Sequence, residues 1–179
     1  HTQYSFSSWS DSQAQSHSIT VPSSATTYTA TYSTRYLLNT VSSPPAGGTI
    51  TPSPAGPWYN PGQTVSLTAN ASAGYTFGSW SGVDSSSGST ASVTMNGYRN
   101  VTANFTPNPT VISDTRMVGQ TLNIDVSTTV GSTYTLEYKD SLADANWTSA
   151  QSQTGTGGII TLSDNTATSP ARFYRVRVQ

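Results

Sequence analysis

The sequence predicts an all-β protein: tandem small β-repeat units followed by an antiparallel β-sandwich. Three observations lead to this prediction. Apolar residues alternate with Ser and Thr in many short runs, as in strands with one buried face. No run has the i, i+3, i+4 apolar spacing of an amphipathic helix. A Tyr-x-Phe-x-x-Trp-Ser run occurs twice, at residues 4–10 and 75–81, so the chain contains an internal repeat.

The composition limits the classes of function. Only 8% of the 179 residues are charged and the net charge is -1, so the basic footprint of a nucleic-acid-binding protein is absent. The chain has no cysteine, which excludes disulfides, thiol nucleophiles and thiolate metal sites. No segment approaches the roughly 20 apolar residues that cross a bilayer. We therefore expect no nucleic-acid partner and no membrane span.

Residues 1–34 are predicted to form a partial β-unit of three short strands. Apolar and polar residues alternate near residues 4–6, 19–21 and 28–32, and Pro22 separates the second run from the third. The exposed apolar face expected of this segment comprises Tyr4, Phe6, Trp9, Ile19, Val21, Tyr28 and Tyr32.

Residues 35–107 are predicted to form a complete unit. The expected strands lie near residues 36–41, 49–51, 65–69, 75–80, 93–95 and 101–105. A loop rich in turn formers, residues 52–62, carries Trp58 and Tyr59. Pro107-Asn108-Pro109 reads as a linker, because two prolines favour extended backbone and end the preceding strand pairing.

An ordered series of short motifs runs through residues 36–106. It consists of Gly47-Gly-Thr-Ile-Thr-Pro52, Tyr59 with Pro61-Gly62, Val65-Ser-Leu67-Thr-Ala69, Gly74-Tyr-Thr-Phe77, Trp80-Ser-Gly82, Val93-Thr-Met95 and Val101-Thr-Ala-Asn-Phe105. The series resembles the divergent internalin B-type bacterial repeat, and its C-terminal half recurs at residues 4–32. The resemblance implies small tandem β-units at an extracellular or cell-surface location, core positions for Trp9 and Trp80, and no catalytic site.

Residues 108–179 are predicted to form a β-sandwich of short strands. Four motifs are informative: Thr133-Tyr-Thr-Leu-Glu-Tyr138, Asp140-Ser-Leu142, Asn146-Trp147-Thr and Arg172-Phe-Tyr-Arg-Val-Arg177. Together they resemble the fibronectin type III-like modules at the C-termini of large secreted bacterial proteins. The resemblance implies that Trp147 plugs the core.

Catalytic, metal and cofactor sites are not expected. His1 and His17 are the only histidines, and neither lies at metal-ligand spacing or near a nucleophile motif, so His17 is expected in a solvated turn. Three acidic residues, Asp140, Asp144 and Asp164, leave turn capping, a calcium site or a glycosidase-type pair open, with capping favoured. The chain is therefore predicted not to be an enzyme.

The one lysine, Lys139, shares a predicted strand with Glu137. Alternation places both side chains on the same face of that strand, which is expected to face solvent. A covalent lysine–asparagine bond of the kind found in pilin-like domains is therefore not favoured.

Two further sets of surface residues are candidates for contacts. Trp58 and Tyr59 suit packing within the domain, contact with another subunit or stacking on a sugar. Asn70, Asn100, Asn104 and Asn146 match the N-glycosylation pattern.

The partial unit at residues 1–34 leads to the functional hypothesis. Counterparts of residues 36–74 are absent from the first copy, so its apolar face needs a cover: an upstream segment, the second copy, or a neighbouring molecule. The last choice predicts a structural subunit of an extracellular bacterial fibre or surface appendage, joined head to tail by strand or sheet complementation. The alternative is a carbohydrate-binding or adhesive accessory module of a large secreted protein.

Overall fold

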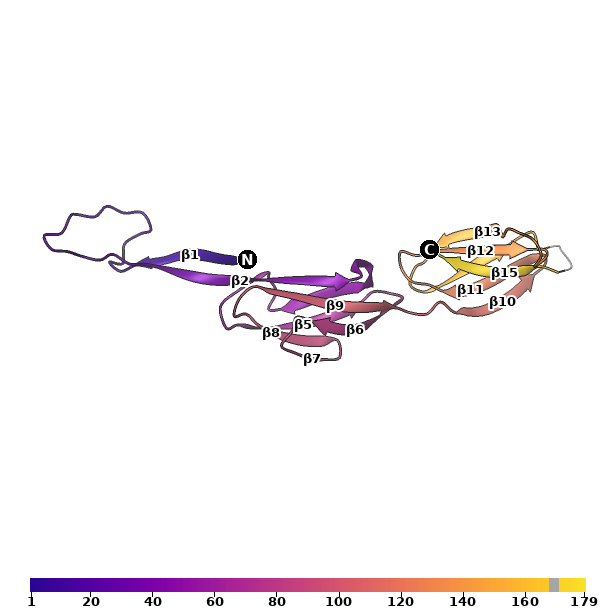
Figure 1. The fold of residues 1–179 in the computed structure, drawn as a ribbon, viewed down its shortest axis with the longest axis horizontal. Coiled ribbons are helices and arrows are strands. Elements are labelled where there is room, and N and C mark those ends of the chain that lie inside the picture. Colours follow the sequence, from indigo (N-terminus) through magenta and orange to yellow (C-terminus); the bar gives the residue numbers. More distant parts are fainter. Residues whose placement is uncertain (168–170) are drawn as a thin grey trace. The chain divides into compact units, whose positions relative to one another are not determined.

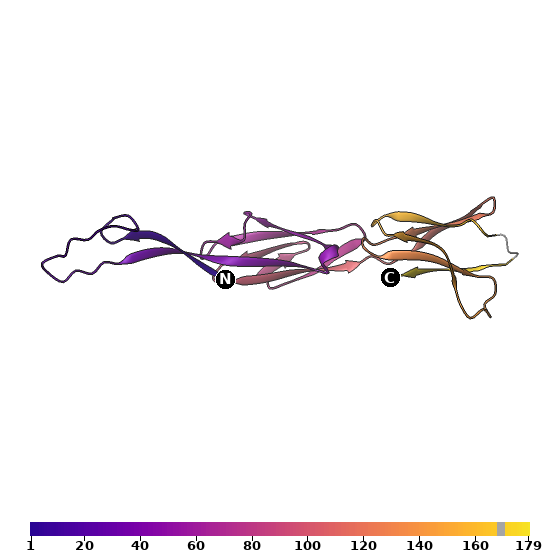
Figure 2. The same ribbon diagram turned by 90° about the horizontal axis from the view of Figure 1, so that it is seen from above.

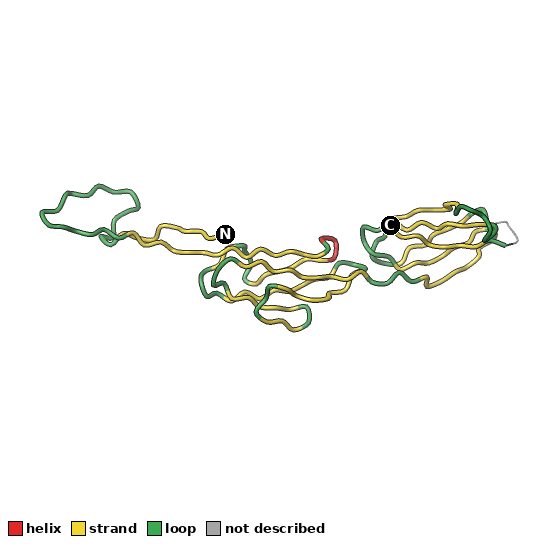
Figure 3. The backbone as a smooth tube through the Cα atoms, in the orientation of Figure 1, coloured by secondary structure: helices red, strands yellow, loops and turns green. Residues whose placement is uncertain are grey.

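The protein is all-β, as expected. A computed structural model describes residues 1–167 and 171–179. In Figure 3 strands dominate, and the one helical turn described is the 3-10 turn η1 (Pro45–Gly47). The strands are β1 (Thr2–Trp9), β2 (Ala30–Ser43), β3 (Gly48–Ser53), β4 (Trp58–Tyr59), β5 (Thr64–Ala71), β6 (Tyr75–Ser81), β7 (Ser85–Ser87), β8 (Thr90–Thr94), β9 (Arg99–Pro107), β10 (Ile112–Val118), β11 (Thr121–Ser127), β12 (Thr133–Lys139), β13 (Thr148–Thr154), β14 (Ile159–Asp164) and β15 (Phe173–Val178).

The chain divides into two compact units. The first comprises His1–Val41, Thr51–Thr68 and Trp80–Thr102, and the second comprises Ser42–Ile50, Ala69–Ser79 and Ala103–Gln179. Some strands of the repeat, such as β2 and β5, contribute residues to both units. The C-terminal strands β10 to β15 belong to the second unit alone.

Two antiparallel sheets make up the repeat. One has the order β1-β2-β9-β6, with β4 also paired to β2, and the other has the order β3-β5-β8-β7. In β5, Val65 and Leu67 are buried and the residues between them are exposed, which is the alternation that the sequence predicts. The register pairs Val65 with Val93 and Leu67 with Ala91, so apolar side chains of β5 and β8 share one face.

The N-terminal segment forms a two-stranded hairpin rather than three short strands. β1 pairs with the first half of β2, from Thr2 opposite Tyr36 to Trp9 opposite Ala30 (Figures 1 and 2). The run at residues 19–21 is not a strand; it lies in the connection that Figure 3 shows as one long loop. β2 continues to Ser43, so one strand crosses the expected boundary at residues 34 and 35.

The C-terminal segment is a β-sandwich of two three-stranded antiparallel sheets. Their orders are β10-β11-β14 and β13-β12-β15 (Figure 1). Their facing side chains form one buried cluster: Ile124, Val126, Tyr134, Leu136, Ile160 and Leu162. The expected apolar strands correspond to β11, β12, β14 and β15, whereas β10 and the polar β13 were not predicted.

Trp147 does not plug this core. It lies just before β13, is partly exposed, and contacts Arg175 and Lys139 instead of the buried cluster. Arg175 alternates with Tyr174 and Val176, which pack on the core, so the ring lies on the outer side of the sheet. The resemblance-based expectation for this tryptophan is therefore wrong.

Candidate functional site

The N-terminal hairpin presents an open sheet edge. β1 is the terminal strand of its sheet, and among the strands described it pairs with β2 only. Natural sheets protect such edges with charged residues, prolines or bulges. β1 contains no charged residue and no proline, and its one irregularity is a register shift between Phe6 and Ser8. The regular stretch before this irregularity, Thr2 to Phe6, can therefore pair with another strand.

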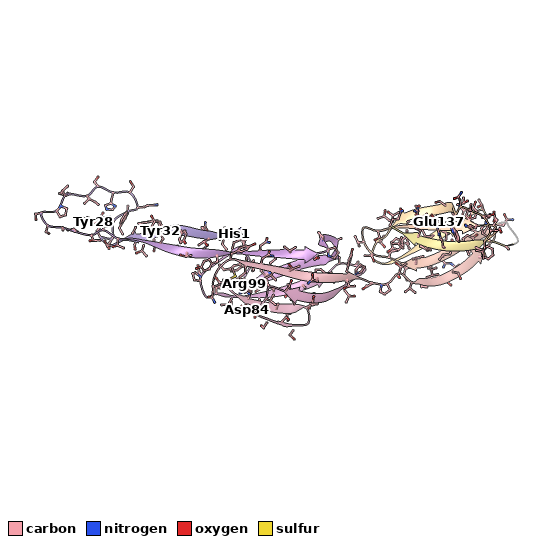
Figure 4. All side chains as sticks on the ribbon, in the orientation of Figure 1. His1, Tyr28, Tyr32, Asp84, Arg99 and Glu137 are labelled. Atoms are coloured by element: carbon pink, nitrogen blue, oxygen red, sulfur yellow. The ribbon has the colours of Figure 1, made fainter. Side chains whose placement is uncertain are left out.

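One face of the hairpin is aromatic. The rings of Phe6 and Tyr32 meet edge to face with centroids 6.0 Å apart, and the centroids of Phe6 and Trp9 are 6.1 Å apart. Tyr4 lies two residues before Phe6 and so shares its face. Tyr4 is 67% exposed and Tyr32 is 53% exposed, so this face remains largely in contact with solvent (Figure 4).

Contacts of Trp9 and His17 hold together the start of the loop that connects β1 and β2. The indole nitrogen of Trp9 donates to the carbonyl of Gln15 at 3.1 Å. The His17 ring bonds through Nδ1 to the Ala14 carbonyl at 2.8 Å and through Nε2 to the Asp11 carboxylate at 3.1 Å, and it packs edge-on against Trp9. The solvated turn expected for His17 is wrong, because its side chain is largely covered.

The base of the hairpin is tied to the repeat. The carbonyl of His1 accepts a hydrogen bond from the Leu37 amide at 3.1 Å, and the His1 ring stacks on Tyr98 with centroids 4.0 Å apart. Figure 4 shows His1 where the hairpin meets the other strands of the first unit. The hairpin is thus anchored at this end.

The structure brings together only part of the expected interface. Tyr4, Phe6, Trp9 and Tyr32 lie together on the hairpin. The exposed side chains of Ile19 and Val21 instead lie in the loop, and Tyr28 is half-buried just before β2.

The loop aromatics differ in exposure. Trp58 and Tyr59 form the short strand β4 rather than an irregular loop, with Tyr59 opposite Tyr36 and Trp58 opposite Leu37. Tyr59 is buried, and its single hydroxyl proton is shared between the carbonyls of Gly56 at 2.6 Å and Pro54 at 2.9 Å. Its side chain therefore stabilises the 52–62 loop and offers no surface contact. Trp58 is half-buried, and its role as a contact stays a prediction.

The four sequon asparagines are not equivalent. Asn70, Asn100 and Asn146 are exposed, whereas Asn104 is half-buried and donates to the Ser79 hydroxyl at 3.2 Å. The Asn100 side chain accepts a hydrogen bond from Asn39 at 2.6 Å. Glycosylation at any of them stays a prediction.

Two of the acidic candidates, Asp164 and Asp140, bind the same arginine. Asp164 is buried and accepts hydrogen bonds from Arg172 at 2.8 Å, Tyr174 at 2.8 Å and the Thr166 amide at 2.8 Å. Asp140 accepts from Arg172 Nε at 2.7 Å. Burial alone raises the pKa of Asp164, but the hydrogen bonds from Thr166, Arg172 and Tyr174 outweigh it and lower the pKa to about 2. This carboxylate is therefore ionised at neutral pH and holds Thr166, Arg172 and Tyr174 in place.

Asp144 caps a turn, as expected. Its carboxylate accepts a hydrogen bond from the Ser141 amide at 3.0 Å. Asp144 also accepts a hydrogen bond from Lys139 Nζ through its backbone carbonyl. The loop between β12 and β13 is therefore held by two hydrogen bonds to Asp144, one from Ser141 and one from Lys139.

Glu137 is buried although it points away from the sandwich core. Arg175 Nε donates to its carboxylate at 2.7 Å, and Arg177 Nε lies 3.0 Å from the other oxygen. Arg175 is directly opposite Glu137 in the register, and both arginines cover it. Alternation placed Glu137 and Lys139 on this face, but the exposure expected of Glu137 is wrong because cross-strand partners cover it. The Arg-x-Arg spacing at residues 175–177 places two arginines on one face of a strand, and this was the sequence signal that could have predicted the cover over Glu137.

The family assignment follows from the first part of the chain. Residues 1–35 and 38–109 match the divergent InlB B-repeat domain, and together these ranges make up more than half of the chain. The chain belongs to the divergent InlB B-repeat family. Both matched ranges agree with the internal repeat read from the sequence, and repeats of this family are typical of bacterial surface proteins.

The C-terminal sandwich lies outside the family match. The family match ends at residue 109, so the fibronectin type III-like resemblance of the following residues stays a prediction. No curated protein and no solved structure matches the chain.

Within residues 1–167 and 171–179, no helix has the length and apolar character needed to cross a bilayer. The same residues contain no group of three or more His, Cys, Asp or Glu side chains placed to hold a metal ion.

Proposed function

We propose that this B-repeat chain is a non-catalytic structural subunit of an extracellular bacterial fibre or surface appendage, and that copies join head to tail through the β1–β2 hairpin. The open, uncharged edge of β1 carries the proposal. Membership of a family typical of bacterial surface proteins supports the location.

The edge and the aromatic face favour the same mode of assembly. A strand from a second copy pairs with the β1 backbone, and other side chains of that copy cover the face formed by Tyr4, Phe6 and Tyr32. Backbone hydrogen bonds supply affinity in such β-augmentation, and buried aromatic rings supply most of the apolar area. Head-to-tail joining pairs β1 of one copy with a different surface of the next, so such a contact propagates into a filament unless its rotation closes a ring.

The test is the assembly state of the purified chain. We expect negative-stain electron microscopy to show filaments and light scattering to show masses that rise with concentration. The double substitution Tyr4→Lys/Tyr32→Lys places charge on the aromatic face and should yield monomers. Met117→Ser/Val118→Ser removes two comparably exposed apolar side chains from β10 and should assemble as the wild type does.

Two outcomes would reject assembly through the hairpin. The first is a wild-type chain that stays monomeric at every concentration reached. The second is filaments that form equally well from the Tyr4→Lys/Tyr32→Lys variant, provided that circular dichroism shows the same strand content in both proteins.

A further inference from the structure

The outer face of the β13-β12-β15 sheet carries three of the seven Lys and Arg residues of the chain. They are Lys139, Arg175 and Arg177. With Glu137 as the acidic residue among them, this face has an excess of positive charge in a chain whose net charge is -1. Basic residues are thus concentrated on one sheet of the C-terminal sandwich.

The two arginines are held in place by the buried glutamate. Glu137 is 7% exposed, whereas Arg175 and Arg177 are 46% and 44% exposed. Both contacts to the carboxylate use Nε, the guanidinium nitrogen nearest the side-chain stem. The terminal amino groups are therefore the accessible part of each guanidinium, and a ligand that binds them need not order two free side chains.

An aromatic surface adjoins these cations. The Trp147 ring centroid lies 4.4 Å from the Arg175 guanidinium carbon and 5.2 Å from Lys139 Nζ. Phe173, which is directly opposite Lys139 in the register, is 40% exposed on the same face. Flat apolar rings therefore lie next to hydrogen-bond donors that carry positive charge.

We propose that this face binds an anionic polysaccharide, one whose sugar rings carry carboxylate or sulfate groups. The planar fork of Arg175 or Arg177 fits either group with two parallel hydrogen bonds. Phe173 supplies an exposed surface against which the apolar side of a sugar ring packs, and Trp147 holds Arg175 and Lys139 beside it. Duplex DNA is a poorer fit, because its binding draws on many phosphate contacts and this face offers three cations.

The site differs from the hairpin and does not depend on assembly. Every residue in it belongs to β12, β15 or the segment just before β13. Binding is therefore expected from the monomeric Tyr4→Lys/Tyr32→Lys variant as well as from the wild-type chain. Failure of either proposal leaves the other intact.

Affinity electrophoresis and calorimetry on the full chain test the proposal with three probes: polygalacturonate, dextran sulfate and uncharged dextran. We expect binding to at least one anionic probe, weakening as salt rises, and none to dextran. Preference for polygalacturonate assigns carboxylate, and preference for dextran sulfate assigns sulfate. Arg175→Gln/Arg177→Gln should weaken binding about tenfold or more, the loss expected from removing charge-assisted hydrogen bonds.

Arg116→Gln is the matched control. Arg116 lies on the other sheet, is 43% exposed and pairs with Asp114 and Asp125, so its loss removes one comparable arginine without touching the site. If the double glutamine variant does not fold, Arg175→Lys/Arg177→Lys keeps a positive charge over Glu137 and removes only the planar fork. That variant should also bind more weakly.

Three results overturn the proposal. One is a folded wild-type chain that binds neither anionic probe. Another is binding that Arg116→Gln weakens as much as the substitutions at residues 175 and 177 do. The last is duplex DNA that binds as tightly as the better polysaccharide with the same dependence on Arg175 and Arg177, which would show a general polyanion surface.

Discussion

Arg99 and Asp84 form an ion pair across the repeat, with Nη2 of the arginine 2.6 Å from Oδ1 of the aspartate (Figure 4). The other carboxylate oxygen accepts a hydrogen bond from the Thr94 amide at 2.6 Å, and Arg99 also donates to the Gly82 carbonyl at 3.0 Å. The Thr94 amide and then the Arg99 guanidinium lower the pKa of Asp84. The pair therefore ties the turn after β6 to the ends of β8 and β9.

Removing this pair should weaken the repeat most at neutral pH. The folded-state pKa of Asp84 is lowered, so its contribution is present above the unfolded pKa and is lost as pH falls through the folded pKa. We expect Asp84→Asn to lower the melting temperature at pH 7 and to make little difference in strong acid. Arg99→Ala should behave alike, and the double variant should lose less than the sum of the two. Thermal unfolding followed by circular dichroism measures this.

An additive double variant would show that the two side chains act independently. Equal losses at neutral and strongly acidic pH would contradict the role given to the ionised carboxylate. Because the pair is partly exposed, we expect its effect on stability to be smaller than that of Gly82→Ala.

Gly82 is required by both conformation and space. Its φ is +79°, and a Cβ there would lie 2.2 Å from the Asn100 carbonyl oxygen. Gly88 has φ +54° with nothing within 4 Å, and nothing lies within 4 Å of a Cβ at Gly97. We therefore expect Gly97→Ala to be nearly neutral and Gly88→Ala to cost about 1 kcal/mol of unfolding free energy.

Gly82→Ala combines the conformational cost with a clash against backbone. We expect it to lower the free energy of unfolding by roughly 1–3 kcal/mol more than Gly88→Ala does, which is the range for overpacking. Urea unfolding of the three alanine variants measures the series. A Gly82→Ala variant no less stable than Gly88→Ala would show that the neighbouring strand moves aside at little cost. The same two constraints account for the glycine that ends Trp80-Ser-Gly82, where the first copy has Asp11.

The sequence predicted the strands whose two faces differ. Val65 and Leu67 stand out against the Ser and Thr around them, because a strand with one buried face needs a period of two. The β7 strand, Ser85–Ser87, has no apolar residue, and β13, Thr148–Thr154, has one, so neither carries that signal. Such strands are held by backbone pairing with a neighbour, which a single sequence does not reveal.

The sequence also failed where partners lie far apart in the chain. Tyr59 was predicted to be a loop aromatic, but it is buried in a strand that pairs with Tyr36, and its hydroxyl is bonded to loop carbonyls. Glu137 was placed on the correct face with the wrong exposure, because its cover comes from Arg175 and Arg177 on β15. For the candidate surface, alternation found Tyr4, Phe6 and Tyr32, since these lie in regular strands.

The buried carboxylate Asp164 should give the C-terminal sandwich a specific sensitivity to acid. Its folded-state pKa is about 2, against an ordinary value of 3.8. Its ionised form therefore stabilises the fold above about pH 4, and the contribution, about 2 kcal/mol, is lost as pH falls from about 4 to about 2. Burial and the hydrogen bond to this carboxylate raise the pKa of Tyr174 to about 12, so the phenol stays a donor across this range.

Asp164→Asn removes this pH dependence and lowers stability at pH 7. Hydrogen exchange of peptides from β11 and β12, recorded across the acid range, reports on the sandwich alone. Asp114→Asn is the control, because Asp114 is exposed and pairs with an exposed arginine. A wild-type sandwich whose protection falls no more steeply than that of Asp164→Asn between these pH values would contradict the assignment.

Removing the Trp9 side chain should loosen the hairpin without unfolding the rest of the repeat. Trp9 contacts Phe6, Gln15 and His17, all within the hairpin and its loop, and is not among the fully buried residues. We expect Trp9→Ala to speed hydrogen exchange and proteolysis at residues 10–29 while leaving the melting temperature of the repeat nearly unchanged. Leu67→Ala, in the core, should instead cost about 2–5 kcal/mol and lower the melting temperature.

His17→Ala distinguishes the two parts of the loop contact. It removes the hydrogen bonds to Ala14 and Asp11 but leaves the hydrogen bond from Trp9 to Gln15. We therefore expect a smaller increase in the hydrogen-exchange rate of residues 10–29 than for Trp9→Ala. Exchange measured on the same peptides in all three variants makes the comparison direct. If Trp9→Ala lowers the melting temperature as far as Leu67→Ala does, the aromatic face contributes to the core of the repeat, and its value as an exposed contact surface falls accordingly.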